Sequence, residues 1–257
     1  RKDNNMTGQL SGKVALVTGA ARDVGRQIAL ALAAEGAAIA VNYQSSGDAA
    51  QGVVKDIEAA GGKARAWQAD VGSSADTNGM VDDVVKTFGG IDIVVNNAGV
   101  AQRARFLETT DEQWQRHIDI GMLATVYTSR AALPYMADAG KGGRIISLGG
   151  DSSRVGEANL SMAAAARAGT IALIKSLAKE FGRYDITCNA ITLGMIQSAH
   201  SDPKWLEEMM PKMVKNYPLK RIGQPGDVAP MVAFLASEGA SWITGQTFSI
   251  NGGFAMI

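Results

Sequence analysis

Short apolar runs alternate with segments of helical periodicity along almost the whole chain, and only short joints separate them. The runs predict strands over residues 13–18, 37–43, 64–68, 91–95, 144–148, 185–191 and 246–250. Helices are expected over 23–35, 48–60, 74–88, 110–136, 160–181 and 225–237, with a short helical piece at 203–210. This alternation predicts βαβ units with right-handed crossovers. The expected fold is therefore α/β: a Rossmann-like, doubly wound parallel sheet in three αβα layers.

Length and composition narrow the class of protein. The 257 residues contain no internal repeat, low-complexity block or linker, so we expect one domain over 12–257 after an N-terminal extension over 1–11. Lys+Arg and Asp+Glu both number 25, which argues against a nucleic-acid or membrane surface. No apolar run reaches the roughly 20 residues that span a bilayer. A single cysteine and two distant histidines, His117 and His200, disfavour a disulfide framework and a metal site. A cytoplasmic location is the default expectation.

A glycine-rich joint, TGAARDVG at 18–25, follows the first predicted strand. Such a joint lets backbone N–H groups and a helix N-terminus face a pyrophosphate, although a tight turn without a ligand has the same pattern. The second strand ends at Asn42-Tyr43 without the carboxylate that NAD-selective sites use for the ribose hydroxyls. With Arg22 nearby, the sequence favours the 2′-phosphate of NADP(H).

Several further motifs complete a pattern. Asp70-Val71 follows the third strand, NNAG at 96–99 follows the fourth, and ITGQTFSINGG at 243–253 closes the chain. Together they resemble the short-chain dehydrogenase/reductase family, close to the 3-oxoacyl-carrier-protein reductases and hydroxyacyl dehydrogenases. The resemblance implies NADP(H) or NAD(H) as cofactor and hydride transfer as chemistry. It places the nucleotide contacts at Gly19, Ala21, Arg22, Val24, Gly25, Asn42, Asp70, Val71, Asn97, Ala98, Gly99, Arg167 and Ile196.

The family's catalytic set does not carry over to this chain. The resemblance implies asparagine, serine, tyrosine and lysine, and the matching positions hold Asp119, Gly150, Ala163 and Arg167. A positioned proton donor contributes roughly 10²–10⁴-fold to rate, so no conventional activity is expected. The residues at 151–153 are expected to solvate a loop, with a replacement catalytic set there as the alternative.

Other residues have a structural and a functional interpretation. Asp23 stands where the family has a glycine, and we expect it to cap its helix or else to repel a pyrophosphate. The methionines over 195–213 either line an apolar pocket or fill irregular packing. Cys188 is expected in the core, and His117 outside or packed on its own helix.

Three functions are compatible with these residues. The preferred one is a non-catalytic subunit of a hetero-oligomeric NAD(P)-dependent hydroxyacyl(-CoA) dehydrogenase, with aromatic degradation as one setting. It would pair with an active paralogue in a heterotetramer, or otherwise form a homotetramer, and its nucleotide binding would be weakened or lost. The alternatives are an active NADP(H)-dependent 3-oxoacyl or ketone reductase with a non-standard proton donor, and a module that binds nucleotide or acyl thioester without turnover.

Overall fold

The computed structural model describes residues 8–199 and 203–257. Its centre is a parallel sheet of seven strands in the order β3-β2-β1-β4-β5-β6-β7, so the predicted doubly wound sheet is confirmed. The strand order reverses between β1 and β4, and ligands of such sheets bind beyond the carboxyl ends of the strands at this reversal. The strands are β1 (Val14–Val17), β2 (Ala38–Tyr43), β3 (Lys63–Gln68), β4 (Ile93–Asn96), β5 (Gly143–Gly150), β6 (Ile186–Leu193) and β7 (Thr247–Ile250).

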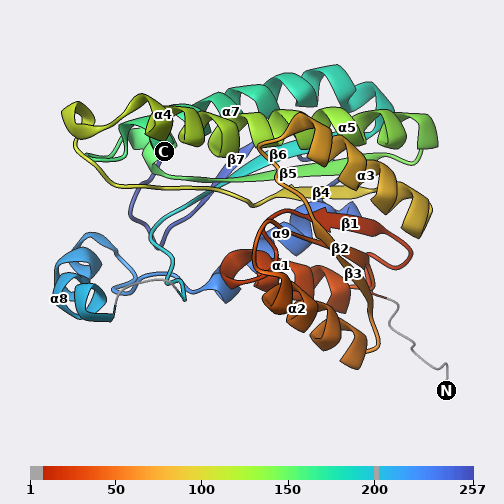
Figure 1. The fold of residues 1–257 in the computed structure, drawn as a ribbon, viewed down its shortest axis with the longest axis horizontal. Helices are drawn as coiled ribbons and strands as arrows, with labels where there is room; N and C mark the ends of the chain where they lie inside the picture. Colours follow the sequence, from red (N-terminus) through yellow and green to blue (C-terminus); the bar gives the residue numbers. More distant parts are fainter. Residues whose placement is uncertain (1–7, 200–202) are drawn as a thin grey trace.

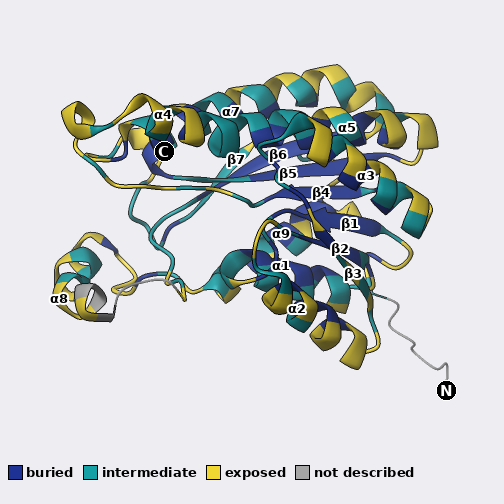
Figure 2. Ribbon diagram, viewed as in Figure 1, coloured by how far each residue is buried: buried dark blue, intermediate teal, exposed yellow. Residues whose placement is uncertain are grey.

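Helices cover both faces of the sheet (Figure 1). One face carries α1 (Asp23–Ala34), α2 (Gly47–Ala59) and α9 (Ala229–Ala236). The other carries α3 (Ser74–Phe88), α4 (Asp111–Ile118), α5 (Ala124–Ala139) and α7 (Ser161–Phe181). Each helical layer packs its own apolar cluster against the strands, and the central strands between the layers are largely buried (Figure 2), whereas the edge strands β3 and β7 are more exposed. This burial on both faces explains why the strands read as continuous apolar runs.

The expected helix over 110–136 is not one α-helix. A π-helical turn over Asp119–Leu123 separates α4 from α5. The wider turn shifts the register of the residues that face α7, and the hydroxyl of Thr170 on α7 donates to the carbonyl oxygen of Gly121 at 2.9 Å. The N-terminus of α3 is capped by Ser73, whose hydroxyl accepts a hydrogen bond from the amide of Asp76.

Two short helices flank the carboxyl ends of the central strands. The turn α6 (Ser152–Val155) lies directly after β5, where we expected a loop. The helix α8 (Pro203–Met213) stands apart from the two helical layers, at the left of Figure 1. In the described residues, none of the helices is long and apolar enough to cross a membrane. His200 and residues 1–7 of the expected N-terminal extension lie outside the described residues.

Candidate functional site

A cleft of about 350 Å³ lies beyond the carboxyl ends of β1, β2 and β4. The structure brings together there every expected nucleotide contact except Arg167 and Ile196. The residues concerned are Gly19, Ala21, Arg22, Val24, Gly25, Asn42, Asp70, Val71, Asn97, Ala98 and Gly99. Ser45, Ser46 and Arg116 also line the cleft and were missed, since no motif marks them in the sequence.

Hydrogen bonds at the ends of neighbouring strands fix the conformation of the glycine-rich joint. Gly19 adopts φ +60°, a left-handed conformation that glycine takes without strain, and its amide donates to Oδ1 of Asn42 at 3.1 Å. The side-chain amide of Asn97 donates to the carbonyl oxygen of Thr18 at 2.9 Å. A side chain at Gly25 would begin 2.3 Å from the carbonyl oxygen of Gly19, so only glycine allows α1 to start so close to the joint.

The far side of the cleft favours a phosphorylated ribose. Arg22 reaches the hydroxyl of Ser46 at 3.3 Å, and the end of β2 presents the amide of Asn42 in place of a carboxylate. A guanidinium and hydroxyls suit a 2′-phosphate, whereas a carboxylate would repel it. The residues present therefore fit a dinucleotide of the NADP(H) type.

Asp23 does not cap α1, which corrects our expectation. Arg22 occupies the N-cap position, and Asp23 is the first helical residue with φ 49°. Its carboxylate Oδ1 accepts instead from the backbone amide of Ala199 at 2.8 Å. The left-handed backbone at this position suits glycine, and the carboxylate bonds to the segment after β6 and not to the free amides of α1.

Gly150 and Arg167 lie against each other at the end of β5. A Cβ atom on Gly150 would stand 2.9 Å from Nη1 of Arg167, and one on Gly99 would stand 3.4 Å from Nη2. Nη2 also donates to the carbonyl oxygen of Val100 at 3.4 Å. Burial lowers the pKa of the Arg167 guanidinium, which nevertheless remains charged. The arginine thus extends through space that two glycines leave empty.

The other two candidate catalytic positions are not among the residues that line either the nucleotide cleft or the cavity next to Arg167. Ala163 lies one helical turn before Arg167 on α7 and is only 2% exposed. Asp119 accepts a hydrogen bond from Nε2 of Gln115 at 2.7 Å and lies beside Gly72. The residue that meets α7 is Gly121, whose Cβ would stand 3.1 Å from that of Ala166. The π-helical turn causes this shift, so Gly121 replaces Asp119 as the residue that faces the site helix.

A second cavity of about 750 Å³ adjoins Arg167. Its walls are largely apolar. Of the two roles expected for the methionines over 195–213, the structure shows the pocket lining, because Met195, Met209 and Met213 border this cavity. Ile196 lies here and not in the first cleft. Its other apolar and aromatic walls are Leu160, Leu193, Tyr217 and Phe254.

Tyr217 is the residue of this cavity that the sequence did not reveal. It is 5% exposed, stacks on Phe254 with ring centroids 5.2 Å apart, and accepts a hydrogen bond from the amide of Met195 at 2.9 Å. Burial raises the pKa of its hydroxyl, with smaller contributions from Glu157 and Asp151. A tyrosine in an irregular segment far from the strand ends carries no signal in sequence.

The residues after β5 do not form a solvating loop, contrary to expectation. Asp151 and Ser152 are buried, and Oδ2 of Asp151 accepts a hydrogen bond from the side-chain amide of Asn251. The hydroxyl of Ser153 donates to the carbonyl oxygen of Gly150 at 2.6 Å. These bonds anchor α6 to the end of β5 and to Asn251, and Asp151 and Ser152 line the wall of the second cavity.

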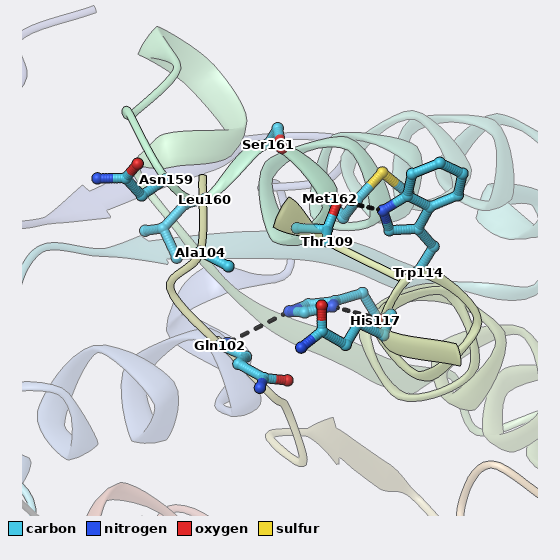
Figure 3. A pocket seen from close by; sticks show the side chains of 10 residues that line it. Gln102, Ala104, Thr109, Trp114, His117, Asn159, Leu160, Ser161 and Met162 are labelled. Atoms are coloured by element: carbon cyan, nitrogen blue, oxygen red, sulfur yellow. Dashed lines mark hydrogen bonds between the residues drawn. The ribbon is translucent and has the colours of Figure 1, made fainter. Parts of the chain in front are cut away.

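The small space beside His117 is not a ligand site (Figure 3). It measures about 10 Å³, room for no more than one water molecule. The buried imidazole lies 2.7 Å (Nδ1) from the carbonyl oxygen of Gln113, and its Nε2 accepts from the amide of Gln102 at 3.3 Å. Both ring nitrogens are thus engaged, and His117 joins α4 to the preceding loop. Cys188 is fully buried on β6, as expected of a core residue.

Comparison with known proteins agrees with this geometry. Residues 19–255 match the family model described as enoyl-(acyl carrier protein) reductase. The 3-oxoacyl-(acyl-carrier-protein) reductase FabG of Staphylococcus aureus is 40% identical over 95% of this chain and 98% of its own length. The corresponding reductase of Synechocystis is 39% identical over 96% of this chain and 98% of its own.

Solved structures share the whole fold. A blue fluorescent protein from a metagenomic library, solved in complex with NADPH, is 34% identical with a TM-score of 0.89, covering 96% of this chain and 100% of that one. A short-chain type dehydrogenase/reductase from Mycobacterium marinum, also 34% identical, has a TM-score of 0.91 over 96% of this chain and 97% of its own. The chain therefore belongs to the short-chain dehydrogenase/reductase family.

Proposed function

We propose that this protein is an NADP(H)-dependent oxidoreductase that acts on a carbonyl compound of the 3-oxoacyl type and takes its proton from Tyr217. The observation that carries the proposal is that Tyr217 lines the same cavity as Gly150 and Arg167. The curated relatives are 3-oxoacyl-(acyl-carrier-protein) reductases, which supports this reaction class. A bound NADPH supplies the hydride.

The hydrogen-bonding state of Tyr217 suits a proton donor. Its oxygen accepts from the amide of Met195, and no acceptor for its own proton occurs among the described residues. The raised pKa, caused first by burial, keeps the hydroxyl protonated at neutral pH. An alkoxide that forms in the cavity is a much stronger base than this phenolate, so the proton moves to the substrate oxygen.

The shape of the second cavity suits an acyl chain. Its methionine and aromatic walls bury apolar atoms, and methionine side chains adapt to chains of different shape. Arg167 contacts Val100, a residue of the nucleotide cleft, and also borders the second cavity. The two spaces therefore meet at this arginine, as hydride transfer between two ligands requires.

The test is NADPH oxidation by the isolated protein with acetoacetyl-CoA, monitored at the nicotinamide absorbance band. Tyr217→Phe keeps the ring stack on Phe254 and removes only the hydroxyl. We expect it to lower kcat by roughly 10²–10⁴-fold while the Kd for NADPH stays unchanged. Tyr184→Phe, in the turn that follows α7 and outside both cavities, is the matched control and should leave kcat unchanged. Equal turnover by wild type and Tyr217→Phe would exclude Tyr217 as the donor.

A second candidate is the non-catalytic subunit expected from the sequence. The observation that favours it is the pair Gly150 and Ala163, which supply neither of the hydroxyls that the family uses. It predicts no turnover by the isolated chain and co-purification with an intact paralogue. The triple variant Gly150→Ser, Ala163→Tyr, Arg167→Lys decides between the candidates. A large gain in rate over a silent wild type supports the subunit, and a wild type that already matches the variant excludes it.

A further inference from the structure

The guanidinium of Arg167 lacks an ionic partner. Among the described residues, no carboxylate lies within ion-pair distance of it, and its hydrogen bond to Val100 is long at 3.4 Å. Arg103, the other arginine that lines the second cavity, is engaged, because it pairs with Glu157. A partly buried guanidinium with unused N–H donors can form charge-assisted hydrogen bonds with an anionic ligand.

The unused donors face the second cavity. Nη2 points to Gly99 and Val100, the nucleotide side, whereas Nη1 lies at Gly150, whose missing side chain opens that end. Arg167 is only partly buried overall, and it belongs to the lining of the second cavity and not to that of the first. The guanidinium of Arg167 therefore presents one edge of its planar group to a ligand in the second cavity.

The carboxylate of Asp151 does not fill this role. It lines the same cavity, but Oδ2 is held by Asn251 and Oδ1 is sealed from solvent. Glu157 is likewise held by Arg103. Of the two arginines that line this cavity in the described residues, Arg103 is ion-paired and Arg167 is not.

We propose that Arg167 binds a carboxylate, so that the natural ligand of the second cavity is an organic acid with an apolar body. The fork of a guanidinium matches a carboxylate in two parallel hydrogen bonds, and the surrounding methionines would bury the carbon chain. If this site is combined with the proposed reductase activity, the substrate is an oxo acid or acyl compound with a free carboxylate. This statement about the substrate rests on the proposed function. The binding site itself does not depend on turnover.

A competing role for Arg167 is contact with the ribose of the nucleotide, through Nη2. The two roles predict different effects of removing the guanidinium on the affinities for NADPH and for the organic acid. If the guanidinium serves the ribose, its removal weakens NADPH binding and leaves acid binding unchanged. If it serves a carboxylate, the effect falls on the acid and depends on its negative charge.

The experiment compares hexanoate with hexanamide, which has the same chain without the charge, by calorimetric titration of the full chain. We expect wild type to bind hexanoate at least about tenfold more tightly than hexanamide, in line with a charge-assisted bidentate contact. Arg167→Met should abolish this ratio, and Arg167→Lys should retain part of it. The double variant Arg65→Gln, Asp83→Asn removes an ion pair outside both cavities without changing net charge, and should keep the full ratio.

Gly150→Ser gives a second, independent variant in case Arg167→Met does not fold. Its new Cβ would crowd Nη1, so the hexanoate preference should fall while hexanamide binding changes little. Equal affinities for the two probes in wild type, or no binding of either at millimolar concentration, would overturn the proposal. So would an Arg167→Met protein that keeps the preference and loses NADPH affinity. Because this experiment measures binding and not turnover, its result does not depend on whether the proposed reductase activity is found.

Discussion

Asp23 and Ala199, 176 positions apart, are joined by a 2.8 Å hydrogen bond from the backbone amide of Ala199 to Oδ1 of Asp23. The bond links the first turn of α1, in the nucleotide cleft, to the segment that follows β6. The neighbouring Ser198 lines the second cavity. One carboxylate thus connects the borders of both cavities, at a position where its negative charge lies close to the expected pyrophosphate.

The charge of Asp23 should weaken nucleotide binding. At about 5 Å and an effective dielectric of about 20, its repulsion of a phosphate is about 3 kcal/mol. Arg26 offsets little of it, because that guanidinium is paired with Asp56 at 2.7 Å. We therefore expect Asp23→Gly to lower the Kd for NADPH by roughly ten- to a hundredfold in fluorescence titrations. Glycine also suits the φ of 49° at this position.

The variant Asp23→Asn separates the effect of the negative charge from the effect of the hydrogen bond to Ala199. It keeps an oxygen that can accept from Ala199 but removes the charge. If repulsion dominates, both variants tighten NADPH binding. If the bond to Ala199 matters more, only the asparagine variant retains wild-type affinity or improves on it. An unchanged Kd in both would show that this carboxylate does not sense the nucleotide.

The contact between Gly150 and Arg167 should appear as non-additivity. Gly150→Ser alone places a Cβ 2.9 Å from Nη1, so Arg167 must move. Arg167→Lys removes that fork, and serine then fits. In a double-mutant cycle by urea denaturation, we expect the two changes to be coupled by roughly 1 kcal/mol, with the double variant more stable than the sum predicts. Strict additivity would mean that the arginine does not occupy the space beside Gly150.

Arg22 should determine the choice of nucleotide. Its guanidinium, beside Ser46, offers the charged contact for a 2′-phosphate. We expect Arg22→Ala to weaken NADPH binding by roughly tenfold or more and to change NADH binding by less than about twofold, since NADH lacks that phosphate. Arg130→Ala, on the exposed side of α5, is the control and should change neither Kd. Equal losses for both nucleotides would assign Arg22 to the pyrophosphate.

The fold could be predicted from sequence because its signals are local. The runs that became β1 and β2 are apolar along almost their whole length, so the sequence marks these strands directly. The cleft residues were also predictable, since Gly19 and Gly25 are required by backbone geometry that a short motif records.

The chemistry of the second cavity could not be predicted in this way. Whether the side chain of Arg167 points into a cavity depends on two glycines from other elements. Tyr217 reaches the site through an irregular segment, and its role depends on packing against Phe254. The position of Gly121 follows from a π-helical turn, which no cap or periodicity marks within a helical pattern.

Cys188 makes a final prediction about alkaline stability. Burial raises the pKa of its thiol from 9.0 to about 12. Because the folded pKa is the higher one, the thiol's contribution to stability is fully present below about pH 9 and is lost as the pH rises through 12. The loss amounts to about 4 kcal/mol at most.

Cys188→Ala lacks this dependence, and at neutral pH it should be less stable by roughly 1 kcal/mol through the lost packing of one sulfur atom. The difference in unfolding free energy between wild type and Cys188→Ala, measured in urea at about pH 7 and about pH 10.5, should therefore shrink and then reverse. Tyrosines and lysines titrate equally in both proteins and cancel in the difference, so a gap that stays constant with pH would place the thiol in contact with water.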